Sequence, residues 1–249
     1  MTPDEMKTGD SSEGGVPLAD STPTDSTTVT LKRNSDLGVR AVSGVVMIAV
    51  AVAALWAGGW VFAALALAAA AAMLWEWHGI TGKMPLTSFA RGGWLTGGFL
   101  YVALGVLALF LVREVLGFAG ALWLMATVWA TDIGAYFAGR TIGGPKIAPA
   151  ISPSKTWAGL IGGMVAAGLV SWLIGRWIGS DATLFKLGAP MAVLAQMGDF
   201  FESWMKRRAG VKDSSALIPG HGGVLDRLDG LLPVAIAIGA ILWLTGSPA

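Results

Sequence analysis

The segment GHGGVLDRLDG, residues 220–230, places four glycines, a histidine, an arginine and two aspartates in a chain that is 54% hydrophobic. Asp226 and Asp229 are three residues apart where the last apolar stretch begins, so a helix would turn them to one face. Acidic residues at a helix start also complement its dipole, which accounts for one aspartate more readily than for two. Because the chain has no cysteine and two histidines, paired carboxylates favour a hard cation such as Mg²⁺, which shares its remaining oxygen ligands with phosphate.

The glycines of this segment permit two interpretations. Glycine allows backbone shapes in which consecutive N–H groups converge on an anion, and this run precedes a helix start, where anions are favoured. Pro219-Gly220 is equally typical of an ordinary turn. His221 is as well explained by packing or capping as by catalysis.

A second polar set follows helical spacing in QMGDFFESWMKR, residues 196–207. At 100° per residue, one narrow stripe contains Gln196, Asp199, Glu202, Ser203 and Lys206. A charge at the centre of a membrane helix costs about 2.5–3.5 kcal/mol on insertion scales. The stripe therefore predicts a face turned to the protein interior or to a watery cavity, with a plain interhelical polar contact as the alternative.

A third set lies in VWATDIGAYFAGRTIGGPKIAPAISPSKTWAG, residues 128–159. Asp132 stands just inside the end of an apolar stretch, and the loop after it supplies the basic residues Arg140, Lys146 and Lys155. Three hydroxyl residues can cap the helix that follows, namely Ser152, Ser154 and Thr156. Membrane anchoring would explain each basic residue singly, but acids and bases beside glycine-rich loops indicate a site for a metal and nucleotide phosphates.

Membrane helices must position these residues. With a mean hydropathy of +0.65 and 13% charged residues, the chain is too apolar for an ordinary soluble domain. Only helices and closed barrels satisfy the backbone in lipid, and barrel strands would be shorter and alternating. We predict an all-α polytopic integral membrane protein, a bundle of about seven transmembrane helices at residues 39–57, 60–78, 94–112, 117–137, 157–178, 183–205 and 231–246.

Charge distribution predicts the orientation. Residues 1–36 hold seven of the sixteen acids and too little apolar surface to fold, so they predict a disordered polar tail; they lack the pattern of a signal peptide. With the N-terminus inside, thirteen Lys and Arg face inward and three face outward, leaving out Lys7. This positive-inside bias predicts a membrane protein with its N-terminus in, its C-terminus out and the loops 138–156 and 206–230 in the cytoplasm.

The stretch SWMKRRAGVKDSSALIPGHGGVLDRLDG resembles the signature of the bacterial phosphatidate cytidylyltransferases, also called CDP-diacylglycerol synthases. The matching positions are Ser203, Lys206-Arg207, Lys212-Asp213-Ser214-Ser215, His221-Gly222-Gly223 and Asp226-Arg227-Leu228-Asp229. Gly198-Asp199, Glu202, Thr131-Asp132 and Ser152-Pro153-x-Lys155-Thr156 also resemble these proteins. The likeness covers about residues 93–246.

This resemblance implies an enzyme that transfers the cytidylyl group of CTP to phosphatidate in phospholipid biosynthesis, giving CDP-diacylglycerol and pyrophosphate. Its transmembrane transferase domain would be residues 37–249, in the inner (plasma) membrane of the cell with the active site on the cytoplasmic side. The implied partners are CTP, phosphatidate and membrane lipid, with no nucleic acid; a homodimer and a second cation beside Mg²⁺ stay open. The implied metal ligands are Asp199, Asp226, Asp229 and Asp132. The implied catalytic residues are Asp199, Lys206, Arg207, Lys212, His221, Asp226 and Arg227, and the substrate-binding residues are Ser152, Lys155, Thr156, Ser203, Gly222 and Gly223.

The chain departs from the family pattern at two points. Ala158 stands where the family commonly has Glu, and seven spans replace eight or nine, the missing pair falling between residues 79 and 93. Three rival functions are a related CTP-dependent membrane transferase or kinase for another lipid such as a polyprenol, an ion-coupled transporter and an inactive paralogue. A transporter would use Asp132 and Asp199 for its cation, but the sequence has no inverted repeat.

Overall fold

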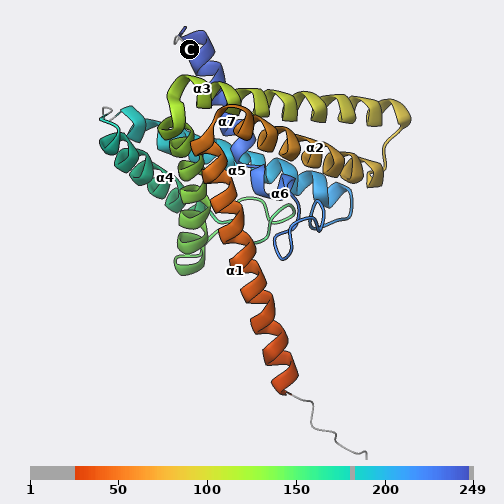
Figure 1. Ribbon diagram of the computed structural model, residues 1–249. Coiled ribbons are helices and arrows are strands. Elements are labelled where there is room, and N and C mark those ends of the chain that lie inside the picture. Colours follow the sequence, from red (N-terminus) through yellow and green to blue (C-terminus); the bar gives the residue numbers. More distant parts are fainter. Residues whose placement is uncertain (1–25, 180–182, 247–249) are drawn as a thin grey trace, which may run out of the picture.

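The computed structural model describes residues 26–179 and 183–246, and within these ranges the chain forms seven helices and no strand (Figure 1). The helices are α1 (Ser26–Ala57), α2 (Gly59–Lys83), α3 (Ser88–Thr141), α4 (Trp157–Trp177), α5 (Thr183–Arg208), α6 (Leu225–Leu228) and α7 (Leu231–Leu244). The all-helical class expected from the sequence is therefore found in the described residues.

Four of the helices are long and apolar enough to cross a membrane, which marks the chain as a membrane protein. Their apolar segments are Gly38–Ala57, Gly59–Lys83, Ser88–Thr141 and Trp157–Trp177. The shorter α7 is also apolar, whereas α5 carries several charges in its second half.

The helix α3 holds two of the expected spans, 94–112 and 117–137. Gly117 has the non-helical angles φ 65° and ψ −167°, which a residue with a side chain adopts only at a cost. Figure 1 shows the two arms of α3 meeting at a sharp bend, with α2 running beside the first arm. The two expected spans are thus joined by a bend at Gly117 inside α3 and not by a separate loop.

The first helix starts upstream of the expected boundary. Residues 26–36, assigned above to a disordered tail, are helical in α1; residues 1–25 of that tail lie outside the described part of the chain. This stretch contains neither proline nor glycine, so nothing in it interrupts a helix that continues from the apolar segment.

Two clusters of buried apolar side chains hold the helices together. In the first, Leu124 on the second arm of α3 packs with Val234 and Ala235 of α7. In the second, Met73 and Trp77 of α2 pack with Met205 at the end of α5. The two clusters fix α5 and α7 against both arms of α3, and these elements carry the polar stripe and the paired aspartates.

A buried polar contact joins α3 to α4. Ser171 accepts a hydrogen bond from Nε1 of Trp123 at 3.1 Å, and its hydroxyl lies 3.1 Å from that of Thr127. Where lipid offers no hydrogen-bond partner, such interhelical contacts fix which helix faces meet. This contact holds in place the arm of α3 that carries Asp132.

Two loops, 142–156 and 209–224, lie at the end of the molecule away from the C-terminus of α7 (Figure 1). The first is closed by an isolated antiparallel bridge between Lys146 and Thr156. Thr156 also caps α4, because its side chain accepts the N–H of Gly159 at 3.0 Å. The expected capping by a hydroxyl residue is therefore confirmed for Thr156.

Candidate active site

The polar stripe of α5 faces the protein interior, as its spacing predicted. Glu202, Ser203 and Lys206 are buried. Within the helix, Oγ of Ser203 donates to Oδ1 of Asp199 at 3.2 Å, and Nζ of Lys206 lies 3.4 Å from Oε1 of Glu202. Each pair is spaced i, i+4, the separation that places two side chains on one helix face.

Asp226 organises the loop before α7. Its Oδ2 accepts three hydrogen bonds, from the backbone N–H of Ser214 at 2.9 Å, the hydroxyl of Ser214 at 2.9 Å and the N–H of Gly223 at 2.8 Å. Its Oδ1 lies 2.5 Å from Nζ of Lys206. One carboxylate therefore ties both ends of the segment 214–223 to α5.

This environment keeps Asp226 ionised. Burial alone would oppose the charge, but the hydrogen bonds from Lys206 and from the N–H of Gly223 outweigh it and lower the pKa of Asp226 to about 2. Hydrogen bonds donated to a carboxylate favour its charged form. Asp226 is thus a fixed negative charge whose oxygens are already engaged with groups of the protein.

A cavity of about 580 Å³ lies among α3, α4, α5 and the two loops. Five acidic and five basic side chains line it: Asp132, Asp199, Asp213, Asp226 and Asp229, with Arg140, Lys146, Lys155, Lys206 and Arg227. These residues come from segments up to about a hundred positions apart in the sequence. The cavity therefore brings together the three polar sets recognised in the sequence.

Gly198 brings two of the aspartates close. A Cβ atom at Gly198 would stand 2.1 Å from the backbone oxygen of Asp229 and 2.7 Å from a ring carbon of Pro233. No side chain fits at that distance, so α5 and the start of α7 approach closely only because residue 198 is glycine. Asp199 consequently faces the same space as Asp229.

The acids of this cavity repel one another. Burial is the largest influence on Asp229 and, together with the charges of Asp199 and Asp132, raises the pKa of its carboxyl to about 7. Lys155 offsets part of the negative charge, since its Nζ lies 2.5 Å from Oδ2 of Asp199 and 4.4 Å from the ring centroid of Phe200. Lys155 reaches this position because the bridge across the loop 142–156 fixes its backbone.

The donor set suits a hard divalent cation. Among the described residues no three Asp, Glu or His side chains form a ready-made metal cluster. Mg²⁺ needs none, because it is usually held by one or two carboxylates together with water and substrate phosphates. Asp132, Asp199 and Asp229 line one cavity, and within residues 26–179 and 183–246 one lysine, Lys155, is paired to them. The charge of a cation would therefore relieve their mutual repulsion. These residues fit the expected Mg²⁺.

Three expected site residues lie in an adjoining cleft of about 610 Å³. Lys212, His221 and Gly222 line this cleft together with Arg40 of α1, and Asp213 and Arg227 line both the cleft and the cavity. Oγ of Ser43 lies 2.8 Å from Nδ1 of His221 and 3.0 Å from the carbonyl oxygen of Pro219. The first helix thus forms one wall of this cleft.

The segment 218–222 is a tight turn. Gly220 and Gly222 have positive φ angles of 75° and 84°, and the N–H of His221 donates to the carbonyl of Ile218 at 3.0 Å. The N–H of Gly223 is taken by Asp226. The sequence suggested that consecutive N–H groups of this run could bind a phosphate. In the structure the N–H groups of His221 and Gly223 are already engaged, the first in closing the turn and the second in binding Asp226.

Four other expected residues line neither the cavity nor the adjoining cleft: Ser203 and Gly223, whose contacts are given above, and Arg207 and Ser152. Arg207 is exposed, and its Nη1 donates to the carbonyl of Val211 at 3.0 Å. Ser152 lies in the loop 142–156, where its N–H donates to the carbonyl of Ala148 at 2.9 Å. Both residues support the loops that carry Lys155 and Lys212.

Sequence reasoning missed Glu76. This residue is 1% exposed and accepts hydrogen bonds from the hydroxyl of Ser215 at 2.6 Å and from the N–H groups of Val224 and Leu225 at 2.9 and 2.7 Å. The available signal was that Glu76 is the one acid in the apolar sequence of α2. A lone acid in a membrane helix is a functional candidate by default.

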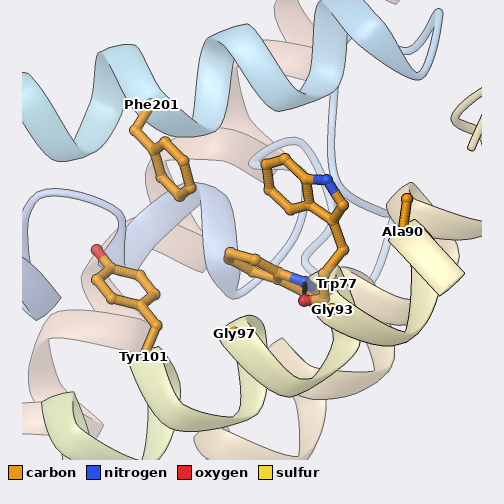
Figure 2. Close-up of a pocket in the computed structure, with 7 residues that line it drawn as sticks. Trp77, Ala90, Gly93, Gly97, Tyr101 and Phe201 are labelled. Carbon is orange, nitrogen blue, oxygen red and sulfur yellow. Dashed lines mark hydrogen bonds between the residues drawn. The ribbon is translucent and has the colours of Figure 1, made fainter.

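A second, apolar cleft of about 450 Å³ lies on the other side of α5 (Figure 2). Phe201 reaches into it from α5 and Tyr101 from α3, with Trp77 of α2 beside them. Nε1 of Trp77 donates to the carbonyl of Trp94 at 2.9 Å, and the rings of Trp94 and Phe201 stack with centroids 6.4 Å apart. Asp199 and Phe201 thus face different cavities from neighbouring positions of one helix.

The fold and the site define a helical membrane protein with a charged cavity at one end of its bundle. The sequence profile of the cytidylyltransferase family matches residues 84–245. This range contains every aspartate that lines the cavity. The chain therefore belongs to the cytidylyltransferase family.

Several bacteria have similar proteins that are named phosphatidate cytidylyltransferase. The phosphatidate cytidylyltransferase of Brucella suis is 45% identical over 159 residues, which cover 62% of this chain and 57% of the relative. That of Helicobacter pylori is 40% identical over 147 residues, covering 58% of this chain and 55% of the relative. The chain thus spans little more than half the length of these two relatives. The phosphatidate cytidylyltransferase of Rickettsia bellii is 36% identical over 215 residues, covering 82% of this chain and 90% of the relative.

Proposed function

We propose that this protein is a phosphatidate cytidylyltransferase. In the reaction, an oxygen of the phosphatidate phosphate forms a bond to the α-phosphorus of CTP, the bond between the α-phosphorus and the bridging oxygen to the β-phosphate breaks, and pyrophosphate leaves. The observation that carries the proposal is the cavity in which five acidic and five basic side chains meet, in a chain of the cytidylyltransferase family.

The chemistry needs little proton transfer. An ionised phosphate monoester is already nucleophilic at neutral pH, so the main obstacle is the repulsion between two polyanions. Preorganised positive charge lowers that barrier. We assign phosphate binding to the basic residues of the cavity rim, Lys155, Arg227, Arg140 and Lys146, while Lys206 holds Asp226 in place.

Asp132, Asp199 and Asp229 would hold Mg²⁺. A bound cation supplies charge neutralisation to phosphate oxygens. Asp226 contributes differently, because both of its oxygens are engaged with Lys206 and the loop. Its role in this proposal is to fix the loop that carries Arg227 and Asp229.

The apolar cleft between α2, α3 and α5 is our candidate for the acyl chains of phosphatidate. It is lined by four aromatic residues, and α5 separates it from the charged cavity by the width of one helix. A lipid phosphate and its chains would then contact opposite sides of the same helix. CTP, which is soluble, would enter the charged cavity from the loops.

We also propose the topology. Seven spans with the N-terminus in the cytoplasm would account for the thirteen inward and three outward basic residues, with α3 supplying two spans through its bend at Gly117. The charged cavity and both loops would then face the cytoplasm of the cell.

The test uses CTP labelled at either end of its triphosphate. The full chain in detergent is incubated with Mg²⁺, phosphatidate and CTP carrying ³²P at the α- or the γ-position. Cytidylyl transfer puts the α-label into lipid and the γ-label into pyrophosphate. A CTP-dependent lipid kinase would put the γ-label into lipid, and dolichol and phytol serve as alternative acceptors for that arm. Transfer of neither label to any lipid would refute the proposal.

A further inference from the structure

Glu76 lies outside the residues that match the family profile, 84–245. It nevertheless contacts Ser215, Val224 and Leu225, which lie within the stretch that resembles the family signature. It is on α2, 1% exposed, and its carboxylate accepts one hydroxyl and two backbone N–H groups of the loop. None of the three salt bridges in the described part of the chain includes it. A buried carboxylate without a cation is costly unless it is hydrogen-bonded, so these three donors are what keep Glu76 in place.

The donors of Glu76 alternate with those of Asp226 along the chain. Asp226 holds Ser214 and Gly223, and Glu76 holds the next residue in each case, Ser215 and Val224. Glu76 also accepts the N–H of Leu225, which directly precedes Asp226. The two carboxylates therefore hold the beginning and the end of the segment 214–225 together. Because Glu76 holds the residues just before Asp226, the position of Asp226 depends on Glu76.

Gly223 shows how closely the loop is seated on Glu76. A Cβ atom at residue 223 would stand 2.3 Å from Oε1 of Glu76 and 2.0 Å from Oγ of Ser214. A larger residue would force the loop away from α2. The second glycine of the His-Gly-Gly run is thus explained by the approach of Glu76 and needs no anion.

We propose that Glu76 is a positioning residue for cytidylyl transfer, acting through the loop 214–225 on Asp226 and its partner Lys206. This inference rests on the proposed function for its catalytic consequence. Glu76 itself does not line the charged cavity. Its effect is to supply acceptors in the geometry that the loop needs, so a side chain of the same shape with one acceptor fewer should not replace it.

The experiment compares Glu76→Gln, Glu76→Asp and Ser215→Ala with wild type. Glutamine keeps the shape but turns an NH₂ group toward a backbone N–H, so kcat should fall about 10- to 100-fold, the cost typical of an outer-sphere positioning partner. The KM for phosphatidate should stay within about twofold. Aspartate restores both acceptor oxygens and should recover part of kcat, and Ser215→Ala, which loses one of three donors, should lower kcat by about threefold.

Hydrogen–deuterium exchange gives a readout that does not require turnover. In Glu76→Gln the peptide covering residues 213–228 should exchange about tenfold faster, because the N–H group of either Val224 or Leu225 loses its acceptor and the loop opens more often. The peptide covering residues 143–156 should not change. Glu114→Gln, at an exposed acid of α3, is the matched control and should behave as wild type.

Two results would overturn the inference. One is wild-type kcat and exchange in Glu76→Gln. The other is a Glu76→Gln protein that fails to fold while Ser215→Ala keeps wild-type kcat and exchange, which would make Glu76 a folding residue only. If wild type makes no CDP-lipid, the proposed function fails, and the exchange experiment still decides whether Glu76 controls the loop.

Discussion

Lys206 and Asp226 form an ion pair that joins α5 to the loop before α7, with 2.5 Å between Nζ and Oδ1. Their side chains are 10% and 4% exposed. Glu202 is a second partner of the same ammonium, 3.4 Å away. A single lysine therefore lies between two buried carboxyl groups and joins α5 to the loop that carries Asp226.

Replacing Lys206 with methionine should destabilise the protein. The change leaves two buried carboxylates without a cation, and breaking a buried pair in this way costs about 3–5 kcal/mol of unfolding free energy. Thermal unfolding in detergent would measure the loss, with Lys83→Met at an exposed position of α2 as control. The double variant Lys206→Met/Asp226→Asn should be more stable than the sum of the single changes predicts; strict additivity would contradict the coupling.

Removing the metal should abolish activity reversibly. After EDTA treatment, CDP-lipid formation should disappear and return with Mg²⁺, whereas Na⁺ at matched ionic strength should not restore it. Asp199→Asn and Asp229→Asn should each lower kcat by at least about tenfold. Because the half-buried Asp229 lies near two other acids, its neutral isostere should leave the melting temperature unchanged or raised. A large fall in melting temperature for Asp229→Asn would contradict this account of the cavity.

Much of the fold followed from the sequence, because hydrophobic length and helical spacing are local properties. The polar stripe of α5 was predicted from i, i+3, i+4 and i+7 spacing alone. The bend at Gly117 was not, since a glycine between two apolar stretches is equally compatible with a short turn. The helical residues 26–36 were also missed, because their polar composition favoured disorder although no proline or glycine interrupts them.

The candidate site was predicted less evenly. Residue type and spacing identified four of the five aspartates that line the cavity, together with Lys155 and Lys206. Asp213, the fifth, entered only as a position of the family signature. Neither source indicated that both carboxylate oxygens of Asp226 accept hydrogen bonds from Lys206 and the loop. Such partners depend on how the loop folds back onto α5. Glu76 was missed for a related reason: its donors, Ser215 and Leu225, lie 139 and 149 residues away in the sequence.

Gly198→Ala tests the close approach of α5 to the start of α7. The added methyl group would stand 2.1 Å from the backbone oxygen of Asp229, so the two segments must separate. Overpacking of this kind costs about 1–3 kcal/mol, and kcat should fall because Asp199 and Asp229 move apart. Gly92→Ala is the matched control, since nothing lies within 4 Å of its Cβ position and alanine favours a helix. Equal stability and activity of the two variants would refute the claim that Gly198 sets the distance between the acids.

Phe201→Ala tests whether the apolar cleft binds acyl chains. Phe201 is 38% exposed and stacks on Trp94 across the cleft, so its removal takes away apolar contact surface with limited damage to the core. Losing such a contact is worth about 1–2 kcal/mol, which corresponds to an increase of about 5- to 30-fold in the KM for long-chain phosphatidate. The KM for CTP should stay within about twofold, because α5 separates Phe201 from the charged cavity. Phe89→Ala, at a residue 94% exposed on α3, serves as the control. Equal increases in both KM values would show that Phe201 stabilises α5 as a whole. The proposal that this cleft binds the acyl chains would then be wrong.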